Sequence, residues 1–293
     1  SQFQKNENFF IICSFKGNGK PQDSPPEFSA KQLKYQVGFA DLELDSWIDD
    51  VIRRHLLDYG PKFSHSSGCQ TPYNFSFLLA YRFLSAEGKQ LSLAQNGEWY
   101  YKQIIFKALS NRYGGYQNRG GKSKQIMINY RANLTPATKV TLTQILDNQI
   151  APELIKDRIV LIGHNAPIVG EGRDTPLGKM PEVWIHVHQT SQILSAVLDH
   201  RSLIWILPQW GNFQWGDLVF IWIWSLSGGM LAWYLRSPLK LTLASGMIIL
   251  LLDQICLTIL IQGGWMPFVP SVLSLLSTGS LVVYIAYQHS KQQ

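Results

Sequence analysis

Three long apolar stretches fill the last quarter of the 293-residue chain, at residues 218–235, 241–261 and 266–287. A helix rises about 1.5 Å per residue, so each stretch is long enough to cross a hydrocarbon core of about 30 Å. We therefore expect an all-α anchor of three transmembrane helices, preceded by a polar region that spans residues 1–200.

The basic residues around these stretches predict their orientation. Two basic residues separate the first stretch from the second and two follow the third, namely Arg236, Lys240, His289 and Lys291. The QGGW link between the second and third stretches carries no charge. Because basic loops stay in the cytoplasm, we expect residues 236–240 and 288–293 to be cytoplasmic and residues 1–217 to be extracytoplasmic.

This orientation divides the chain into an exported domain, an interfacial segment, an anchor and a tail. Residues 1–200 are enough to bury a core of their own. Residues 201–217 contain three tryptophans but are interrupted by Pro208 and Gly211, so we expect them to lie at the membrane interface. Residues 218–287 form the three-helix anchor, and residues 288–293 form a cytoplasmic tail.

The exported part has the sequence signals of an α/β fold. Short apolar runs predict strands at residues 9–15, 35–44 and 50–57. Residues 75–86 place apolar side chains at helical spacing, which predicts a helix that faces the core. The Asn96–Gly97 pair is typical of a turn between two antiparallel strands.

A strand, helix, strand order follows. Residues 125–131 predict a strand, residues 141–146 and 152–155 have helical signals with Thr141 or Thr143 as N-cap, and RIVLIG at residues 158–163 predicts a second strand. If the two strands are parallel neighbours, the crossover is right-handed and their carboxyl ends meet at one edge of the sheet.

That edge is the candidate ligand site, because ligands of open α/β sheets bind beyond the carboxyl ends of the strands. The residues expected there are Asn129, Tyr130, Arg131, Gly163, His164 and Asn165. The guanidinium of Arg131 would hold a carboxylate or phosphate with two hydrogen bonds. An ordinary surface or ion-paired arginine is the alternative interpretation.

The cysteines and one aspartate carry further expectations. Cys13 and Cys69 lie in the exported part, where disulfides persist, and they either pair or remain two separate buried thiols. Cys256 lies within the second apolar stretch. Asp253 lies in the same stretch, and such residues usually face the bundle interior. The alternative is that Asp253 is hydrated near the outer interface.

Other chemistries have weak support. The net charge is +6, but the basic residues are scattered among acidic ones, which argues against nucleic-acid binding. The GGKS sequence at residues 120–123 lacks the preceding glycine of a phosphate-binding loop. His186 and His188 could ligate a metal, although hydrogen-bonded histidines are the favoured interpretation. No motif of a hydrolase is present, so we expect no enzyme, no metal and no cofactor.

Several segments together resemble the second type of CHASE domain, the cyclase and histidine-kinase associated sensory extracellular domains of bacterial receptors. The matching segments are residues 37–57, 128–132, 140–163, 175–188 and 264–273. The cysteine pair and the SQILSAVLD sequence are most similar to cyanobacterial members. The resemblance implies a ligand-sensing module in the bacterial plasma membrane, periplasmic in its exported part, that takes part in signal transduction.

The resemblance also implies an output domain elsewhere in the protein. Few residues follow the third stretch, so we expect output through a cytoplasmic domain upstream of residue 1, with a caspase-like CHAT domain as the first candidate. The expected partners are the lipid bilayer, a small anionic ligand or an extracytoplasmic protein, and a second copy of the chain. A structural module that binds a protein partner, and less so an exported enzyme, are the alternative functions.

Overall fold

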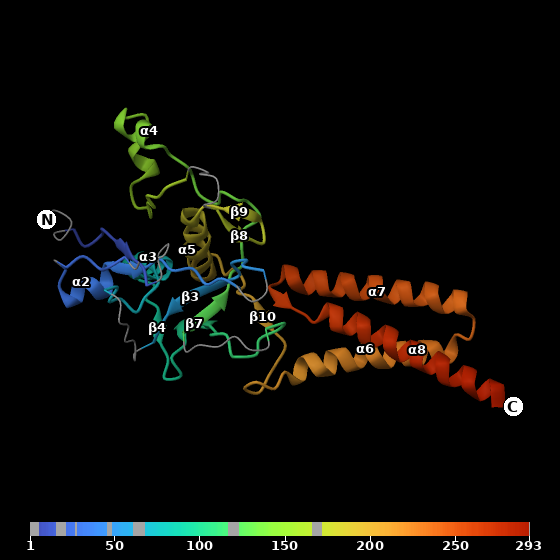
Figure 1. Cartoon of the computed structure of the whole chain (residues 1–293). Helices are drawn as coiled ribbons and strands as arrows, with labels where there is room; N and C mark the ends of the chain where they lie inside the picture. The colour runs from blue at the N-terminus through green and yellow to red at the C-terminus, as the bar shows by residue number, and fades with distance from the viewer. Residues whose placement is uncertain are drawn as a thin grey trace. The chain divides into compact units, whose positions relative to one another are not determined.

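A computed structural model describes residues 6–15, 22–26, 28–45, 49–60, 68–116, 123–165 and 172–292. The chain divides into two compact units. Unit 1 comprises Ser1–Ala108 and Gly121–Leu203, and unit 2 comprises Leu109–Gly120 and Ile204–Gln293. The front of the chain is mixed α/β and the end consists of three apolar helices, so the predicted fold class is confirmed (Figure 1).

The described part of unit 1 contains short strands and five helical segments. Its strands are β1 (Ile11–Cys13), β2 (Val37–Phe39), β3 (Arg54–Asp58), β4 (Ser92–Leu93), β5 (Trp99–Tyr101), β6 (Ile104–Phe106), β7 (Lys124–Met127), β8 (Arg173–Thr175) and β9 (Gly178–Met180). Its described helices are α2 (Ala30–Tyr35), α3 (Phe75–Ala86), α4 (Leu142–Leu146), the 3-10 helix η1 (Pro152–Leu154) and α5 (Glu182–Leu198).

The strands form ladders with mixed directions. β1 pairs with β2 in parallel, and β3 pairs with β7 in antiparallel fashion with His55 opposite Ile126. Single bridges at Tyr73 and Asn74 connect these two ladders. β4, β5 and β6 form an antiparallel meander, and Gly97 has the positive φ of 77° that the predicted turn between β4 and β5 requires.

The main core of unit 1 lies where α3 and α5 meet the strands. α3 begins and ends at the predicted residues, and Asn74 caps its N-terminus by accepting a hydrogen bond from the Ser76 amide. The buried cluster combines residues from β3, α3, the meander, β7 and α5, namely Leu57, Phe77, Ala80, Leu84, Leu91, Trp99, Phe106, Ile126, Ile193, Ala196 and Val197. This core fixes α5 against the sheet.

Residues 132–165 form an arm that leaves the packed part of unit 1 between β7 and β8. α4 and η1 have no buried residue, and α4 projects away from the other elements of unit 1 (Figure 1). The prediction of a strand at residues 158–163 is wrong: none forms there, and Ile162 is 92% exposed. The apolar composition of residues 158–163 is typical of a buried strand. A strand also needs a neighbouring strand to pair with, and local composition does not show whether one is present.

α5 carries both histidines that the sequence singled out. It begins at Glu182, four residues before His186. His186 and His188 therefore lie on a helix, where residues two apart point in different directions. Pro181 stands directly before the first helical residue, a position at which its missing amide hydrogen costs the helix nothing.

Unit 2 contains α6 (Trp215–Tyr234), α7 (Pro238–Ile261), α8 (Phe268–Gln292) and the short parallel pair β10 (Trp205–Ile206) and β11 (Gly264–Trp265). The three helices are long and apolar enough to cross a membrane, as the sequence predicted. A loop from earlier in the chain belongs to this unit: the Tyr113 hydroxyl donates to the Ile204 carbonyl at 3.0 Å, and Gln214 donates to the Gly114 carbonyl at 2.9 Å.

A candidate anion-binding site on unit 1

Arg131 lies just beyond β7 and is held by α5. Its backbone amide donates to Nδ1 of His188 at 3.3 Å, and its Nε donates to the Ser191 hydroxyl at 2.7 Å. His188 is almost fully buried, and its ring stacks edge-on against Tyr130 at 5.0 Å. Residues 130 and 131 are therefore fixed in place by one face of α5.

Arg201 approaches the same segment from the end of unit 1. Its Nη2 donates to the Asn129 side chain at 2.8 Å and to the Tyr130 carbonyl at 3.0 Å. Asn129 in turn donates to the Ser202 carbonyl at 2.9 Å. These bonds join the end of β7 to the last residues of unit 1.

The two arginines form an electropositive group beside the buried imidazole of His188. Burial lowers the pKa of Arg201, and the charge of Arg131 lowers it further. Burial also lowers the pKa of His188; the nearby Leu134 carbonyl opposes this effect, while Arg131 and Arg201 add to it. A cation that lowers the pKa of a neighbouring arginine lies close enough to repel it.

No carboxylate neutralises this group among the described residues. The ion pairs there are formed by Arg53, Arg54, Arg173 and Lys179, and none involves Arg131 or Arg201. Nη1 of Arg201 and Nε2 of His188 are buried without a hydrogen-bond partner in the described part of the chain. A buried guanidinium nitrogen with no acceptor is costly unless an anion or water supplies one.

The structure brings together only half of the residues predicted for the site. Asn129, Tyr130 and Arg131 lie together as expected. Gly163 lies against Val183, and Asn165 accepts a hydrogen bond from the Trp184 indole at 2.5 Å, so both are near the start of α5 rather than at His188. His164 is exposed. The predicted crevice between two strand ends is wrong because residues 158–163 form no strand beside β7.

Sequence analysis missed Arg201, since it assigned residue 201 to an interfacial segment. Arg201 is 70 residues from Arg131 in the sequence, and only the packing of α5 against the sheet brings them together. The absence of any acidic residue within one position of Arg131 or Arg201 is a weak signal that could have paired them.

His186 belongs to a buried polar network rather than to a metal site. Its Nδ1 lies 2.7 Å from the Ser76 hydroxyl, which also donates to Gln189 at 3.0 Å. Nearby, Nε2 of His55 lies 3.3 Å from the Asn74 side chain. No group of three or more metal-ligating side chains occurs among the described residues. Of the GGKS sequence, residues 120–122 lie outside the described residues.

The structure also places the cysteines and Asp253. Cys13 and Cys69 are joined by a disulfide with their Cα atoms 5.4 Å apart, and both are fully buried. Cys256 is a free thiol in α7. Asp253 is half-buried, and Gln254 donates to it at 3.4 Å. Thr278, a polar residue of α8, donates to the Ser225 carbonyl of α6 and the Ser274 carbonyl of its own helix.

The family of the chain follows from its similarity to known domains. A family model described as the CHASE2 domain matches residues 1–230. The match covers most of the 293 residues, so the chain belongs to the CHASE2 domain family. CHASE2 is a sensory domain of signalling receptors. No curated protein and no solved structure gives a significant match.

Proposed function

We propose that this chain is the extracytoplasmic sensing and membrane-anchoring module of a bacterial receptor, and that its ligand is a small anion bound beside Arg131 and Arg201. The observation that carries the proposal is the electropositive group without a neutralising carboxylate. An anion would accept hydrogen bonds from the guanidinium of Arg131 and from the orphaned Nη1 of Arg201. We propose that these residues bind and do not catalyse.

The position of Arg201 supports a route for the signal. Leu203 ends unit 1 and Ile204 begins the last segment of unit 2, which leads into α6. An anion that draws Arg201 toward Arg131 would pull on the chain two residues before this junction. A ligand shifts the equilibrium between two conformations only if it makes different contacts in each of them. The hydrogen bonds from Arg201 to Asn129 and Tyr130 are contacts that a bound anion can change.

The same proposal includes the location of the parts. We place residues 1–217 outside the cytoplasm of a bacterial cell, with residues 236–240 and 288–293 inside. The disulfide between Cys13 and Cys69 supports an oxidising compartment for unit 1. The basic residues at one end of the helices support the orientation.

The proposal is tested by thermal unfolding of the purified chain in detergent with rising concentrations of phosphate, sulfate or acetate. At least one anion should raise the melting temperature, because a ligand that binds only the folded form stabilises it. Arg131→Gln should weaken the apparent affinity by about 10- to 100-fold, as expected for a lost charged hydrogen bond of about 1.5 to 3 kcal/mol.

Arg158→Gln is the matched control. Arg158 is an exposed arginine of the arm, and its Nε donates to the Glu153 carbonyl at 3.4 Å. It should leave the anion response unchanged. A chain that no anion stabilises, or an Arg131→Gln variant with unchanged affinity, would contradict the proposed site.

The arm supports a second candidate function, a module that docks a protein partner. Leu142 and Leu146 are each 70% exposed on α4, and Val160 and Ile162 are exposed at the far end of the arm. Exposed apolar surface of this kind marks protein interaction sites. A scaffold of this type would act through the arm and need no small ligand.

Site-specific crosslinking separates the two candidates. A photoreactive residue at position 146 should join the arm to a protein in intact membranes, whereas the same residue at Lys139, a polar exposed position of the arm, should give less product. Loss of the adduct in Leu142→Gln would assign it to the apolar surface. No protein adduct at position 146 would remove the partner-binding candidate.

A further inference from the structure

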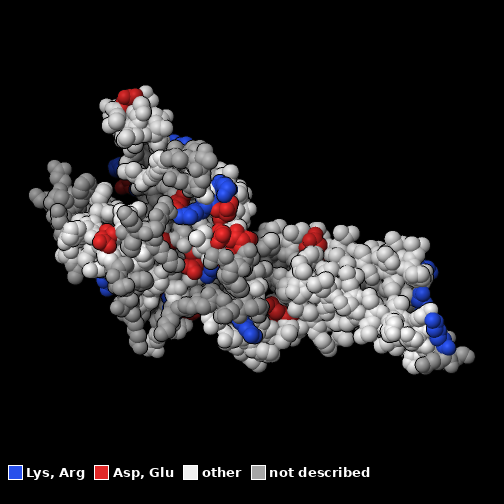
Figure 2. Space-filling view, in the orientation of Figure 1, with Lys and Arg blue, Asp and Glu red and all other residues white. Residues whose placement is uncertain are grey.

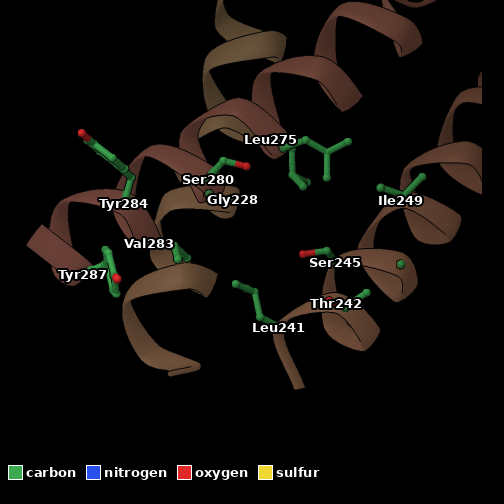
Figure 3. A pocket seen from close by; sticks show the side chains of 13 residues that line it. Gly228, Leu241, Thr242, Ser245, Ile249, Leu275, Ser280, Val283, Tyr284 and Tyr287 are labelled. Atoms are coloured by element: carbon green, nitrogen blue, oxygen red, sulfur yellow. The ribbon is translucent and has the colours of Figure 1, made fainter. Parts of the chain in front are cut away.

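A cavity of about 760 Å³ lies between the three apolar helices of unit 2 (Figure 3). α7 lines one side with Leu241, Ser245, Gly246 and Ile249. α8 lines the other side, from Leu275 to Tyr287, and α6 contributes Gly228. The size is that of a site for a lipid-sized or drug-sized molecule.

The cavity exists because the three helices pack unequally. α6 and α8 touch closely: a Cβ at Gly228 would collide with the Leu275 carbonyl, and the Thr278 hydroxyl donates to the Ser225 carbonyl at 2.8 Å. α7 makes few contacts with either helix. A Cβ added at Gly246 would meet nothing within 4 Å, so the wall of α7 that faces the cavity has open space in front of it.

The walls of the cavity suit hydrocarbon. Leucine, isoleucine, valine and glycine dominate the lining. The hydroxyl of Thr242 donates a hydrogen bond to the Pro238 carbonyl at 2.9 Å, so it does not need an acceptor from a molecule in the cavity. Helices in a bilayer are surrounded by acyl chains, so a groove of this kind fills with a chain unless another helix covers it.

Positive charge is concentrated at one end of the cavity. Lys240 directly precedes the lining residue Leu241, and Nζ of Lys291 lies 4.7 Å from the ring centroid of Tyr287, which also lines the cavity. Arg236 lies in the connection between α6 and α7, four residues before Lys240. On the face shown in Figure 2, blue basic side chains lie at the far end of the helices and no red acidic side chain lies beside them.

The acidic residues of this unit lie elsewhere. Residues 204–293 contain only two carboxylate side chains, Asp217 and Asp253. Asp217 is in the first turn of α6, and Asp253 is more than three helical turns along α7 from Lys240. The basic residues at the cavity mouth therefore have no carboxylate partner within the described part of unit 2, and they complement a phosphate.

We propose that this cavity binds an anionic phospholipid. An acyl chain lies between α7 and the pair formed by α6 and α8, and the phosphate of the headgroup lies near Arg236, Lys240 and Lys291. This end of the helices is the one that the charge pattern predicts to face the cytoplasm, where anionic lipids attract basic residues next to membrane helices. The bound lipid fills the space that the sparse packing of α7 leaves open.

The proposal is tested on the purified full chain in detergent, by native mass spectrometry with added phosphatidylglycerol or phosphatidylcholine of the same acyl composition. The chain should retain phosphatidylglycerol preferentially. The Arg236→Gln, Lys240→Gln double variant should lose about tenfold in affinity for phosphatidylglycerol, while Lys139→Gln, a lysine of the arm, should not.

A second variant tests the acyl-chain part of the cavity. Gly246→Leu places a side chain in the open space and should reduce retention of both lipids, while Met247→Leu, at an adjacent and 71% exposed position, should leave it unchanged. Equal retention of the two lipids, unaffected by the double variant, would overturn the proposal. Loss of a dimer in Gly246→Leu without loss of lipid would overturn it in favour of a second copy in the groove.

Discussion

The two units differ in the kinds of side chain that they bury and expose. Unit 1 buries polar and charged side chains at its centre: Asp45, His55 and Asn74 are each 0% exposed. Unit 2 leaves large apolar side chains outside, with Trp233 and Ile261 exposed to 73% and 88%. Water around unit 1 makes apolar burial the driving force, so a buried polar group there must be paired.

The contacts inside unit 2 show what replaces apolar burial. The residues that α6 buries are Gly216, Gly228 and Ala232, all small. Small side chains let helix backbones approach, which is how helices associate where lipid tails are as apolar as the side chains. The comparison therefore predicts that unit 1 is sensitive to the loss of polar partners and unit 2 to the gain of volume.

The largest effect is expected from removing the charge that neutralises Asp45. Arg54 is buried and contacts Asp45 at 2.6 Å and Gln125 at 2.8 Å. Arg54→Ala would leave a carboxylate buried without its main cation, so the free energy of unfolding should fall by about 3 to 5 kcal/mol.

Arg53→Ala is the matched control. Arg53 is the adjacent, partly exposed residue; it pairs with the exposed Asp49 at 2.6 Å and contacts Asp45 at a longer 3.3 Å, so its removal leaves Asp45 paired with Arg54. Denaturant titrations of the two variants should show a much smaller loss for Arg53→Ala. Equal losses would mean that the interior of unit 1 does not depend on its polar pairing.

Acid should destabilise unit 1 next most strongly. Burial lowers the pKa of His55 to about 3 and that of His186 to about 4. Between pH 6.5 and these values the unfolded chain takes up protons that the folded chain excludes, so stability falls as the pH falls. Each histidine should cost about 2 kcal/mol between pH 8 and pH 5.

Thermal unfolding of the full chain across this pH range measures the effect. His186→Gln, which keeps a polar side chain but cannot titrate, should flatten the pH dependence. A variant with the same pH dependence as the parent chain would show that His186 is not held neutral by burial.

The packing of unit 2 should respond to a single methyl group. Gly228→Ala places a Cβ against the Leu275 carbonyl, a contact that requires α6 and α8 to separate. We expect a loss of about 1 to 3 kcal/mol, the usual cost of overpacking. Gly229→Ala is the control, because its Cβ would lie at an ordinary 3.8 Å from Val282. Equal behaviour of the two variants in detergent unfolding would contradict the close packing of α6 and α8.

Local signals predicted most of the fold. The three apolar helices, α3 and the turn at Gly97 follow from length, helical spacing and turn chemistry, which act over a few neighbouring residues. The strand prediction at residues 158–163 failed because it depends on contacts between residues that are far apart in the sequence. A strand needs a partner, and contacts of Asn129 and Arg131 with residues 188–202 turn the chain away from the sheet directly after β7.

The candidate site was predictable only in part for the same reason. Arg131 was found because it follows a strand, which is a local pattern. Arg201 reaches it through the packing of α5, a relation between residues far apart in the sequence that no spacing rule encodes. The unpaired nitrogens that define the site are visible only once the side chains are placed.

The central claim is that unit 1 senses outside the cytoplasm, and labelling the two ends of α7 tests it most directly. Ser237 is the N-cap and Gln262 the C-cap of this helix, so a cysteine at each position reports on one end. The next residue, Gly263, is a poorer labelling position because its positive φ of 87° disfavours a side chain. In a Cys256→Ala background the only other cysteines are held in the disulfide. An impermeant maleimide applied to intact cells should label Gln262→Cys and leave Ser237→Cys unlabelled until the membrane is permeabilised. Labelling of Ser237→Cys alone would place unit 1 in the cytoplasm and contradict the account.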